Sequence, residues 1–324
     1  MASSDPRIST SEFESNLGER LEVFFGASDP AQARIYAQLQ LPDALRFDEA
    51  GLRLNGRLIG PECEFAHTLP ARIPIIHRDA SQMTLLAEAI VPDPCFWTPE
   101  LPFLYRAEIQ LQRGDELLAS WQRTVGIRRL GARGRFLFFE GKRFVLRGIF
   151  NDGERSNLET TLANQAEFFR QTWTALVVPN PNSRFCQFSA RRGILLVADL
   201  RDTVANDATS LTTIIQQLAQ APAVGVAVLP NDPSVAAIRQ HLRNLLLAQF
   251  CSANESLAIA PWADLLFVEV SDLADFLQKT AHGNLPIVAV RRDHGSNSVE
   301  QSRAACDRLQ SDLAKFGDFA GYVI

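Results

Sequence analysis

Cysteine is scarce in this sequence and shows no pairing pattern. The 324 residues contain five cysteines, which are Cys63, Cys95, Cys186, Cys251 and Cys306. Their odd number and scattered positions indicate neither a disulfide framework nor a Cys-x-x-Cys metal site. Since reduced thiols are typical of the cytoplasm, we expect a cytoplasmic protein whose cysteines are mostly structural.

Histidine is equally rare, and the motifs of bound cofactors are missing. The five histidines are His67, His77, His241, His282 and His294, and none has the spacing of zinc ligands. The sequence also lacks a phosphate-binding loop, a glycine-rich dinucleotide motif and a Gly-x-Ser-x-Gly nucleophile elbow. We therefore expect no metal and no cofactor.

Long apolar runs and long basic runs are absent as well. No segment approaches the roughly 18 consecutive apolar residues of a membrane span, and residues 1–10 lack the apolar region of a signal peptide. The net charge of −5 argues against nucleic acid as the main partner. We expect neither a membrane nor nucleic acid among the partners. The hydrophobic content of 46% predicts a packed core.

The first part of the chain has the pattern of an antiparallel β-structure. Apolar and polar residues alternate in segments 21–25, 34–40 and 106–112, as expected for strands with one solvated face. Turn-forming residues separate such segments at 27–30, 55–56 and 113–115. We expect a disordered or loosely attached N-terminus over residues 1–20 and an antiparallel β-sandwich over residues 21–132.

The second part, residues 133–324, alternates apolar strands with amphipathic helices. The predicted strands are 144–149, 175–178, 194–198, 224–229, 257–259, 265–270, 287–290 and 321–324. One of the predicted helices carries Ile238, Leu242, Leu245 and Leu246 on a single face. Eight strands in this alternation predict a (β/α)8 TIM barrel. The region is shorter than the about 250 residues typical of such barrels, so a complete and an incomplete barrel both stay open.

Three segments at the join between these parts resemble one protein family. They are residues 95–105 (CFWTPELPFLY), 124–129 (TVGIRR) and 136–149 (FLFFEGKRFVLRGI). In this order they resemble glycoside hydrolase family 2, the family of β-galactosidases, β-glucuronidases and β-mannosidases. Weaker similarity continues through residues 185–199, 221–232 and 263–269. The resemblance implies an immunoglobulin-like sandwich followed by a TIM barrel that hydrolyses O-glycosyl bonds.

The resemblance also implies where the catalytic groups of this family would lie. Its two glutamates stand at the carboxyl ends of the fourth and seventh barrel strands. Asp232 falls at the acid/base position, beside Asn231, which in the family holds the sugar's 2-hydroxyl group. Arg291 falls at the nucleophile position, and Asp199 and His294 are further candidates for substrate binding.

The residue types at these positions argue against the family's chemistry. The guanidinium of Arg291 stays protonated and has no lone pair for attack on a sugar. It would also repel the oxocarbenium-like transition state. Asp232 keeps a carboxyl group but is shorter than glutamate, and with Pro233 it has the pattern of a helix N-cap. The catalytic motifs are therefore degenerate.

Two alternatives for the charged residues stay open. Arg291 could form an ion pair with Asp232 or Asp293 that fills the old catalytic centre. Glu269, which ends the predicted sixth strand, could form a salt bridge to Arg291 or Arg292. It could instead act with Asp232 as a pair of carboxyl groups with inverting spacing, which is about 6.5–9.5 Å.

Three hypotheses for function follow. The first is a catalytically inactive family relative that binds a carbohydrate or a protein partner. The second is a divergent glycosidase that uses Asp232 and Glu269. The third is a structural or assembly protein whose sandwich is the interaction surface.

Overall fold

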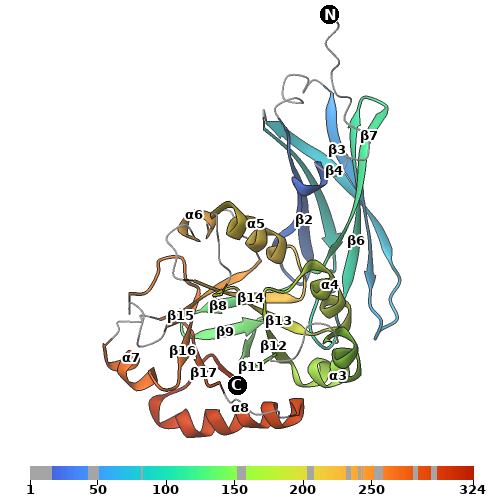
Figure 1. Ribbon diagram of the computed structural model, residues 1–324. Helices are drawn as coiled ribbons and strands as arrows, with labels where there is room; N and C mark the ends of the chain where they lie inside the picture. The colour runs from blue at the N-terminus through green and yellow to red at the C-terminus, as the bar shows by residue number, and fades with distance from the viewer. Residues whose placement is uncertain are drawn as a thin grey trace, which may run out of the picture. The chain divides into compact units, whose positions relative to one another are not determined.

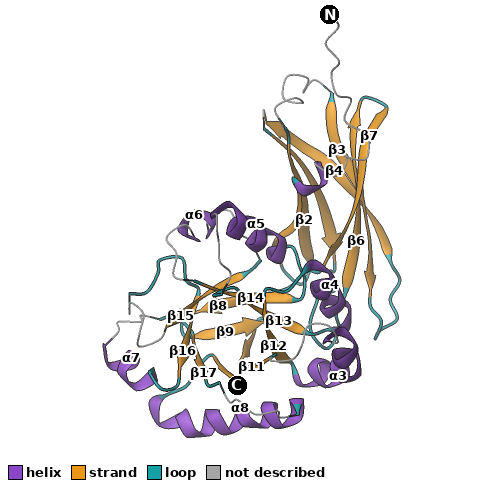
Figure 2. Ribbon diagram, viewed as in Figure 1, coloured by secondary structure: helices purple, strands orange, loops and turns teal. Residues whose placement is uncertain are grey.

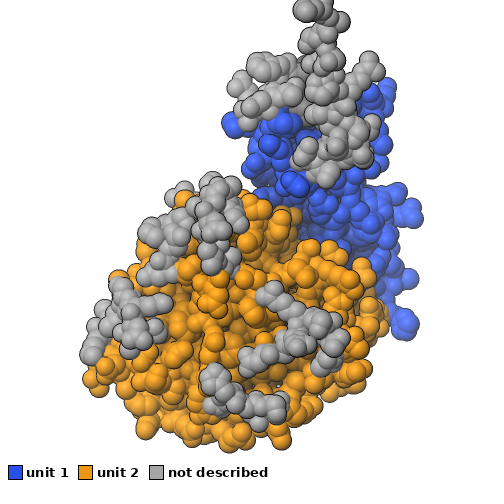
Figure 3. Space-filling view, viewed as in Figure 1, with its two compact units in different colours: residues 1–62, 67–95, 103–127 blue, residues 63–66, 96–102, 128–324 orange. Residues whose placement is uncertain are grey.

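The computed structural model contains two compact units, coloured separately in Figure 3. The described residues are 17–42, 51–81, 83–151, 158–202, 208–230, 235–239, 242, 244–251, 258–279, 284–292 and 298–324. The first unit comprises residues 1–62, 67–95 and 103–127, and the second comprises residues 63–66, 96–102 and 128–324. Two short segments from within the first region of the sequence thus belong to the second unit.

The first unit is a seven-stranded antiparallel sheet. Its strands are β1 (Leu21–Ser28), β2 (Gln32–Gln40), β3 (Leu52–Glu62), β4 (Ala71–Ser81), β5 (Thr84–Pro92), β6 (Leu104–Arg113) and β7 (Glu116–Val125). They are ordered β1-β2-β5-β4-β3-β6-β7, and β4 pairs with β3 through its first half and with β5 through its second. This order is the one found in immunoglobulin constant-type sandwiches.

Side-chain alternation explains the core of this unit. Along β2, Ala33, Ile35, Ala37 and Leu39 are buried, while the intervening residues are at least partly exposed. Successive side chains of a strand point to opposite faces, so one face of each strand forms the core. The strands predicted at 21–25, 34–40 and 106–112 are confirmed.

The second unit begins with a small three-stranded antiparallel sheet and continues as a closed parallel barrel (Figures 1 and 2). The small sheet has β8 (Leu130–Arg133), β9 (Phe136–Phe139) and β10 (Lys142–Phe144). The barrel strands are β11 (Leu146–Phe150), β12 (Thr174–Pro179), β13 (Leu195–Asp199), β14 (Val224–Leu229), β15 (Leu246–Cys251), β16 (Leu265–Glu269), β17 (Ile287–Val290) and β18 (Gly321–Val323). Because β18 pairs with both β17 and β11, the barrel is complete.

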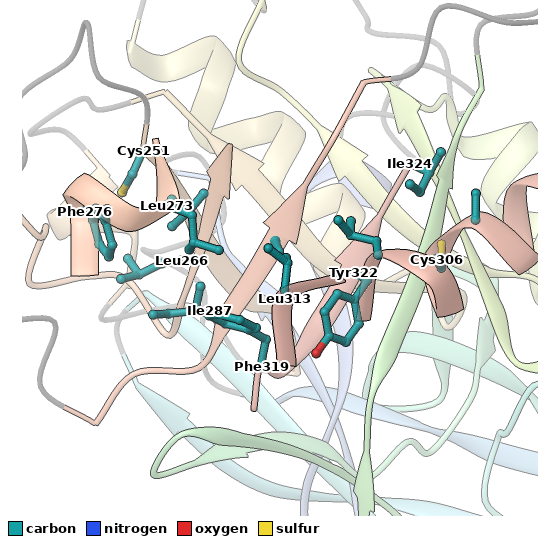
Figure 4. Packing of buried hydrophobic residues seen from close by; sticks show 14 residues of the cluster. Cys251, Leu266, Leu273, Phe276, Ile287, Cys306, Leu313, Phe319, Tyr322 and Ile324 are labelled. Atoms are coloured by element: carbon teal, nitrogen blue, oxygen red, sulfur yellow. The ribbon is translucent and has the colours of Figure 1, made fainter. Parts of the chain in front are cut away.

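Helices connect most of the barrel strands on the outside. They are α3 (Leu158–Thr172), α4 (Ser183–Arg192), α5 (Ala208–Ala219), α6 (Val235–Arg239), α7 (Leu273–Lys279) and α8 (Val299–Leu313), followed by the 3-10 turn η2 (Ala314–Phe316). Figure 4 shows how α7 and α8 pack Phe276 and Leu313 against residues of β16, β17 and β18. Burial raises the pKa of the Cys306 thiol in this cluster to about 11, in keeping with a structural role.

The predicted fifth strand is wrong. The strand β15 begins at Leu246 and ends at Cys251, whereas residues 258–260 have no regular secondary structure. Leu246, expected on a helix, therefore begins a strand. The segment 245–251 is almost continuously apolar, and periodicity alone does not distinguish a buried strand from a buried helix in so short a run.

Residues 258–264, the described part of the connection from β15 to β16, contain no helix. We call this segment the strap. Gln249 on β15 is 1% exposed, and its side chain donates to the Ala258 carbonyl oxygen and accepts from the Ala260 N–H, at 3.0 and 2.8 Å. The side chain thus satisfies two backbone groups of the strap, as buried polar groups require.

The turn between β9 and β10 gives a first prediction. Glu140 and Gly141 have φ angles of +51° and +75°, as in a type I′ hairpin turn, in which Asn-Gly is preferred. Glu140→Asn is expected to raise the free energy of unfolding by about 1 kcal/mol, because asparagine tolerates a positive φ better than glutamate. Urea denaturation of both proteins measures the gain.

This gain is expected to depend on pH. Burial raises the pKa of Glu140, although Arg129 at 3.9 Å opposes the shift. A raised folded-state pKa means that the contribution of Glu140 to stability is present at acid pH and is lost as pH rises through that pKa. The gain should thus be larger at neutral than at acid pH. Glu140→Gln is the control, because it removes the charge and keeps the strained turn; an equal gain in both variants contradicts the turn argument.

Candidate functional site

The alternation of side chains decides which residues enter the mouth of the barrel. On β16 and β17, Leu266, Val268, Ile287 and Ala289 belong to the cluster packed against the outer helices. Residues at alternate positions therefore face the barrel interior. Continuing this alternation past the strand ends places Glu269 and Arg292 toward the interior and Arg291 toward the helices.

Asp199 lies at the mouth of the barrel. It is the last residue of β13 and is 8% exposed. The side chain of Arg201, two residues further along, folds back onto it: Nε lies 2.9 Å from Oδ1 and Nη2 lies 2.7 Å from Oδ2. The Arg201 backbone N–H also donates to Oδ1, at 3.2 Å. This bidentate arrangement is the strong form of a guanidinium–carboxylate contact.

A second arginine approaches the same carboxylate from β17. The Nη2 atom of Arg292 lies 3.8 Å from Oδ2 of Asp199. Each guanidinium also lies over an aromatic ring of another strand: Arg201 lies 3.9 Å from the ring centre of Phe250, and Arg292 lies 4.7 Å from that of Phe150. We call these five residues the mouth cluster. Cation–π contacts of this kind stabilise a partly buried guanidinium.

The charges of the mouth compensate one another. Burial alone would lower the pKa of Arg201, but the hydrogen bonds and charge of Asp199 raise it, with smaller contributions from Asp202 and Glu269. The positive charges of Arg201 and Arg292 are thus balanced by the carboxylate of Asp199, and Arg201 also by those of Asp202 and Glu269. An ion pair in this setting holds its carboxylate in place and leaves it little freedom to act as a base or a nucleophile.

Arg291 forms its described ion pair with helix α8, on the outside of the barrel. Its Nη1 atom lies 3.8 Å from Oδ2 of Asp312 on α8, and its backbone N–H donates to the Val323 carbonyl oxygen, at 2.9 Å. In the mouth, Asp199 forms an ion pair with Arg201 and Arg292. The two-residue period of the strand turns Arg291 outward and Arg292 inward, so Arg292 is the one that reaches Asp199. A pair of Arg291 with Asp232 or Asp293 stays a prediction, because both aspartates lie outside the described residues.

The remaining predicted site residues divide into two groups. Asn231, Asp232 and His294, together with Asp293, lie outside the described residues, so their proposed roles stay predictions. Glu269 is partly buried at the end of β16, and its charge is one of the smaller contributions that raise the pKa of Arg201. A salt bridge from Glu269 to Arg291 or Arg292 stays a prediction. The separation of Asp232 and Glu269 likewise stays a prediction.

Sequence reasoning missed Arg201 and the two phenylalanines of the mouth cluster. The available signal was positional: each stands at, or just beyond, the carboxyl end of a barrel strand, where the active sites of such barrels lie. The Asp199-x-Arg201 spacing was a second signal, since it allows an arginine to fold back onto a carboxylate.

No group of three or more histidine, cysteine, aspartate or glutamate side chains among the described residues could hold a metal ion. None of the helices in that part of the chain is both long and apolar enough to cross a membrane.

Comparisons with known proteins now give the family context. Residues 61–128 match the model of the family described as glycosyl hydrolases family 2. A β-galactosidase from Klebsiella pneumoniae is 35% identical over 77 residues, which are 24% of this chain and 7% of that protein. The chain therefore spans only a small part of the curated relatives it matches.

Solved structures share the fold over most of the chain. A glycosyl hydrolase family 2 member from Bacteroides cellulosilyticus has a TM-score of 0.62 at 13% identity, covering 94% of this chain and 43% of its own. A β-glucuronidase from Bacteroides uniformis has a TM-score of 0.61 at 16% identity, and the match covers 94% of this chain and 45% of that enzyme. The β-glucuronidase of Bifidobacterium dentium complexed with coumarin-3-O-glucuronide has a TM-score of 0.60 at 13% identity. This match covers 94% of this chain and 59% of that enzyme.

The chain is thus similar to glycoside hydrolase family 2, and the resemblance seen in its sequence is confirmed. Because the sequence identities with the solved structures are low, the structural similarity establishes only the fold. It does not carry over the substrates of the solved enzymes.

Proposed function

We propose that this chain is a catalytically inactive glycoside hydrolase family 2-like protein that binds a carbohydrate at the mouth of its barrel. The observation that carries the proposal is the mouth cluster, in which the Asp199 carboxylate is held by Arg201 and approached by Arg292. We further propose that the first unit is an immunoglobulin-like sandwich, on the strength of its strand order, and that the protein is cytoplasmic.

Loss of catalysis follows from the charges at the mouth. A retaining glycosidase needs a free carboxylate nucleophile about 5–5.5 Å from its acid/base group. The seventh barrel strand is instead followed by Arg291 and Arg292, and the second of these contributes a positive charge to the mouth. A guanidinium neither attacks an anomeric carbon nor stabilises an oxocarbenium-like transition state.

Binding of a carbohydrate is supported by the N–H donors of Arg292, which are accessible to solvent. The side chain of Arg292 is 46% exposed, and its contact with Asp199, at 3.8 Å, is longer than a hydrogen bond. Its N–H groups can therefore donate to the hydroxyl or carboxylate oxygens of a sugar. The β-galactosidases and β-glucuronidases to which the chain is similar act on glycosides, which makes sugars the first ligands to test.

The test combines turnover with binding. The full chain is incubated with 4-nitrophenyl β-D-galactoside and β-D-glucuronide, and we expect no release of nitrophenolate. Saturation-transfer NMR with the same compounds is expected to show binding that Arg292→Ala weakens and that the control Arg308→Ala, on the exposed face of α8, leaves unchanged. Turnover that is lost in Asp232→Ala overturns inactivity; absence of binding to either glycoside overturns the proposed ligand.

Substitution of the aligned nucleophile position gives a further prediction. Arg291→Glu is expected to restore no glycosidase activity, because the side chain at this position points toward α8 and Asp312 rather than into the barrel. The same nitrophenolate assay measures it, and the unchanged protein is the control. Measurable turnover in this variant would show that residue 291 reaches the substrate.

A second candidate is a divergent glycosidase that uses Glu269 with Asp232. The observation in its favour is that Glu269 ends β16 on the interior side of the barrel and is only partly buried. Turnover by the unchanged protein that disappears in Glu269→Gln, with inversion at the anomeric carbon seen by NMR, supports this candidate. Turnover unaffected by Glu269→Gln excludes it.

A further inference from the structure

The first unit carries a flat face rich in arginine on strands β4, β3, β6 and β7. The register of these strands brings outward-facing residues together in rows across the sheet. One row contains Arg72, Ile59, Arg106 and Thr124, and the next contains Pro74, Arg57, Glu108 and Gln122. Two further rows add Asn55, Gln110 and Ser120, and then Arg53, Gln112 and Leu117. We call this set the arginine face; its strands are labelled in Figure 1.

The opposite side of the same strands explains why these residues face outward. Leu54 and Leu58 of β3 and Ala107, Ile109 and Leu111 of β6 are fully buried. Because side chains alternate, the residues between them lie on the solvent side of the sheet. Arg53, Arg72 and Gln110 are exposed, and the side chains of Arg57 and Arg106 are 54% and 42% exposed.

The charge of this face is opposite to that of the whole chain. Its described residues include four arginines and one carboxylate, Glu108, whereas the net charge of the chain is −5. Adjacent strands lie about 4.8 Å apart and residues rise about 3.4 Å along a strand, so the backbones of Arg53 and Arg57 are about 14 Å apart and those of Arg72 and Arg106 about 10 Å. Positive groups spread at such intervals fit an extended ligand with repeated negative charges better than a single small anion.

The other side chains narrow the class of ligand. The rows contain amide and hydroxyl groups, which hydrogen-bond to hydroxyl groups. No aromatic side chain lies in these described rows, whereas single-stranded nucleic acids are bound by stacking on aromatic rings. Of the large aliphatic residues in the rows, Ile59 is 9% exposed and Leu117, in the last row, is 53% exposed. The middle rows therefore lack the apolar centre typical of protein interfaces.

Glu108 shows how the face holds a carboxylate. Its Oε2 atom accepts from Nε of Arg57, at 2.5 Å, and its Oε1 atom lies 3.6 Å from Nε of Arg106. A planar carboxylate thus fits between two guanidiniums from neighbouring strands. We propose that the arginine face binds an acidic polysaccharide whose repeated negative groups are carboxylates, that is, a polyuronate. This site lies on the first unit and is independent of the function proposed for the barrel mouth.

Biolayer interferometry with the full chain tests the proposal. The probe is polygalacturonate at about 50 mM salt, where surface charges are weakly screened. Binding is expected for polygalacturonate and not for neutral dextran. The double variant Arg53→Gln/Arg72→Gln is expected to weaken binding about tenfold, since it removes two exposed charges. Glu108→Gln is expected to strengthen binding several-fold, because it releases Arg57 and Arg106 to the ligand.

The control variant Arg184→Gln/Arg308→Gln makes the same charge change on helices of the second unit and is expected to leave binding unchanged. Equal weakening in this control would overturn the proposal, because net charge alone would then explain it. Absence of binding, or binding unaffected in Arg53→Gln/Arg72→Gln, overturns it as well. Tighter binding to dextran sulfate assigns the ligand to sulfate esters, and tighter binding to polyuridylate assigns it to nucleic acid; either result contradicts a polyuronate.

Discussion

Replacement of Trp97 by alanine is expected to lower the free energy of unfolding by about 4 kcal/mol. Trp97 is fully buried in the second unit, and its Nε1–H donates to the Ala190 carbonyl oxygen, at 2.9 Å. It lies in the segment 96–102, which is held together by the backbone pairing of Trp97 with Pro102. The substitution removes a large apolar surface and leaves a cavity, and it also leaves the Ala190 carbonyl without this donor.

Urea denaturation followed by circular dichroism measures the loss, and Trp97→Phe divides it into two parts. Phenylalanine retains most of the buried surface but lacks the N–H group, so this variant is expected to lose about 1–2 kcal/mol. Equal losses in Trp97→Phe and Trp97→Ala would show that the hydrogen bond, rather than burial of the ring, stabilises the segment.

Asp199→Ala is expected to lower the free energy of unfolding by about 3 kcal/mol. The carboxylate and the Arg201 guanidinium are only 10% and 19% exposed, so removal of the carboxylate leaves a positive charge in a poorly solvated position. Arg292 loses its nearby carboxylate in the same change. The loss is therefore caused mainly by the uncompensated Arg201, and it can be reversed by removing that residue too.

The double variant Asp199→Ala/Arg201→Leu tests this explanation. It is expected to be more stable than Asp199→Ala, because an ion pair replaced as a whole leaves no buried charge behind. Asp318→Ala is the control: its pair with Arg143 is exposed, so its loss should stay below about 1 kcal/mol. A double variant that is no more stable than Asp199→Ala would show that Arg201 is not the source of the loss.

The strands of the first unit could be predicted because each has one solvent-facing side and one buried side, as β2 shows. The barrel strands were harder, because both of their faces are covered and their sequences no longer alternate. The fifth strand was misplaced for this reason. The sequence of Leu245–Cys251 fits a helical and a strand pattern equally well. The hydrogen bonds between Gln249 and the strap depend on tertiary contacts, which the sequence pattern does not predict.

The sequence indicated the end of the barrel at which the mouth cluster lies and named Asp199, but it did not indicate the two arginines that hold Asp199. The resemblance to the family, which places Arg291 at the nucleophile position, indicated which strand end to consider. It did not indicate that Arg291 would meet Asp312 on α8 while Arg292 turns to Asp199. Which of two adjacent residues enters the interior depends on the register of the neighbouring strands, and a family pattern does not contain that information.

The closure of the barrel has a consequence for how the protein folds. Arg147 of β11 pairs with Tyr322 of β18, so the ring is completed by contacts between two distant parts of the sequence. Such non-local pairing is slow, because the intervening chain must first be ordered. During synthesis, β11 and β17 have unpaired edges until residues 321–323 have been added, and unpaired edges can associate with other chains. Assembly of this unit is thus most prone to aggregation just before its last strand arrives.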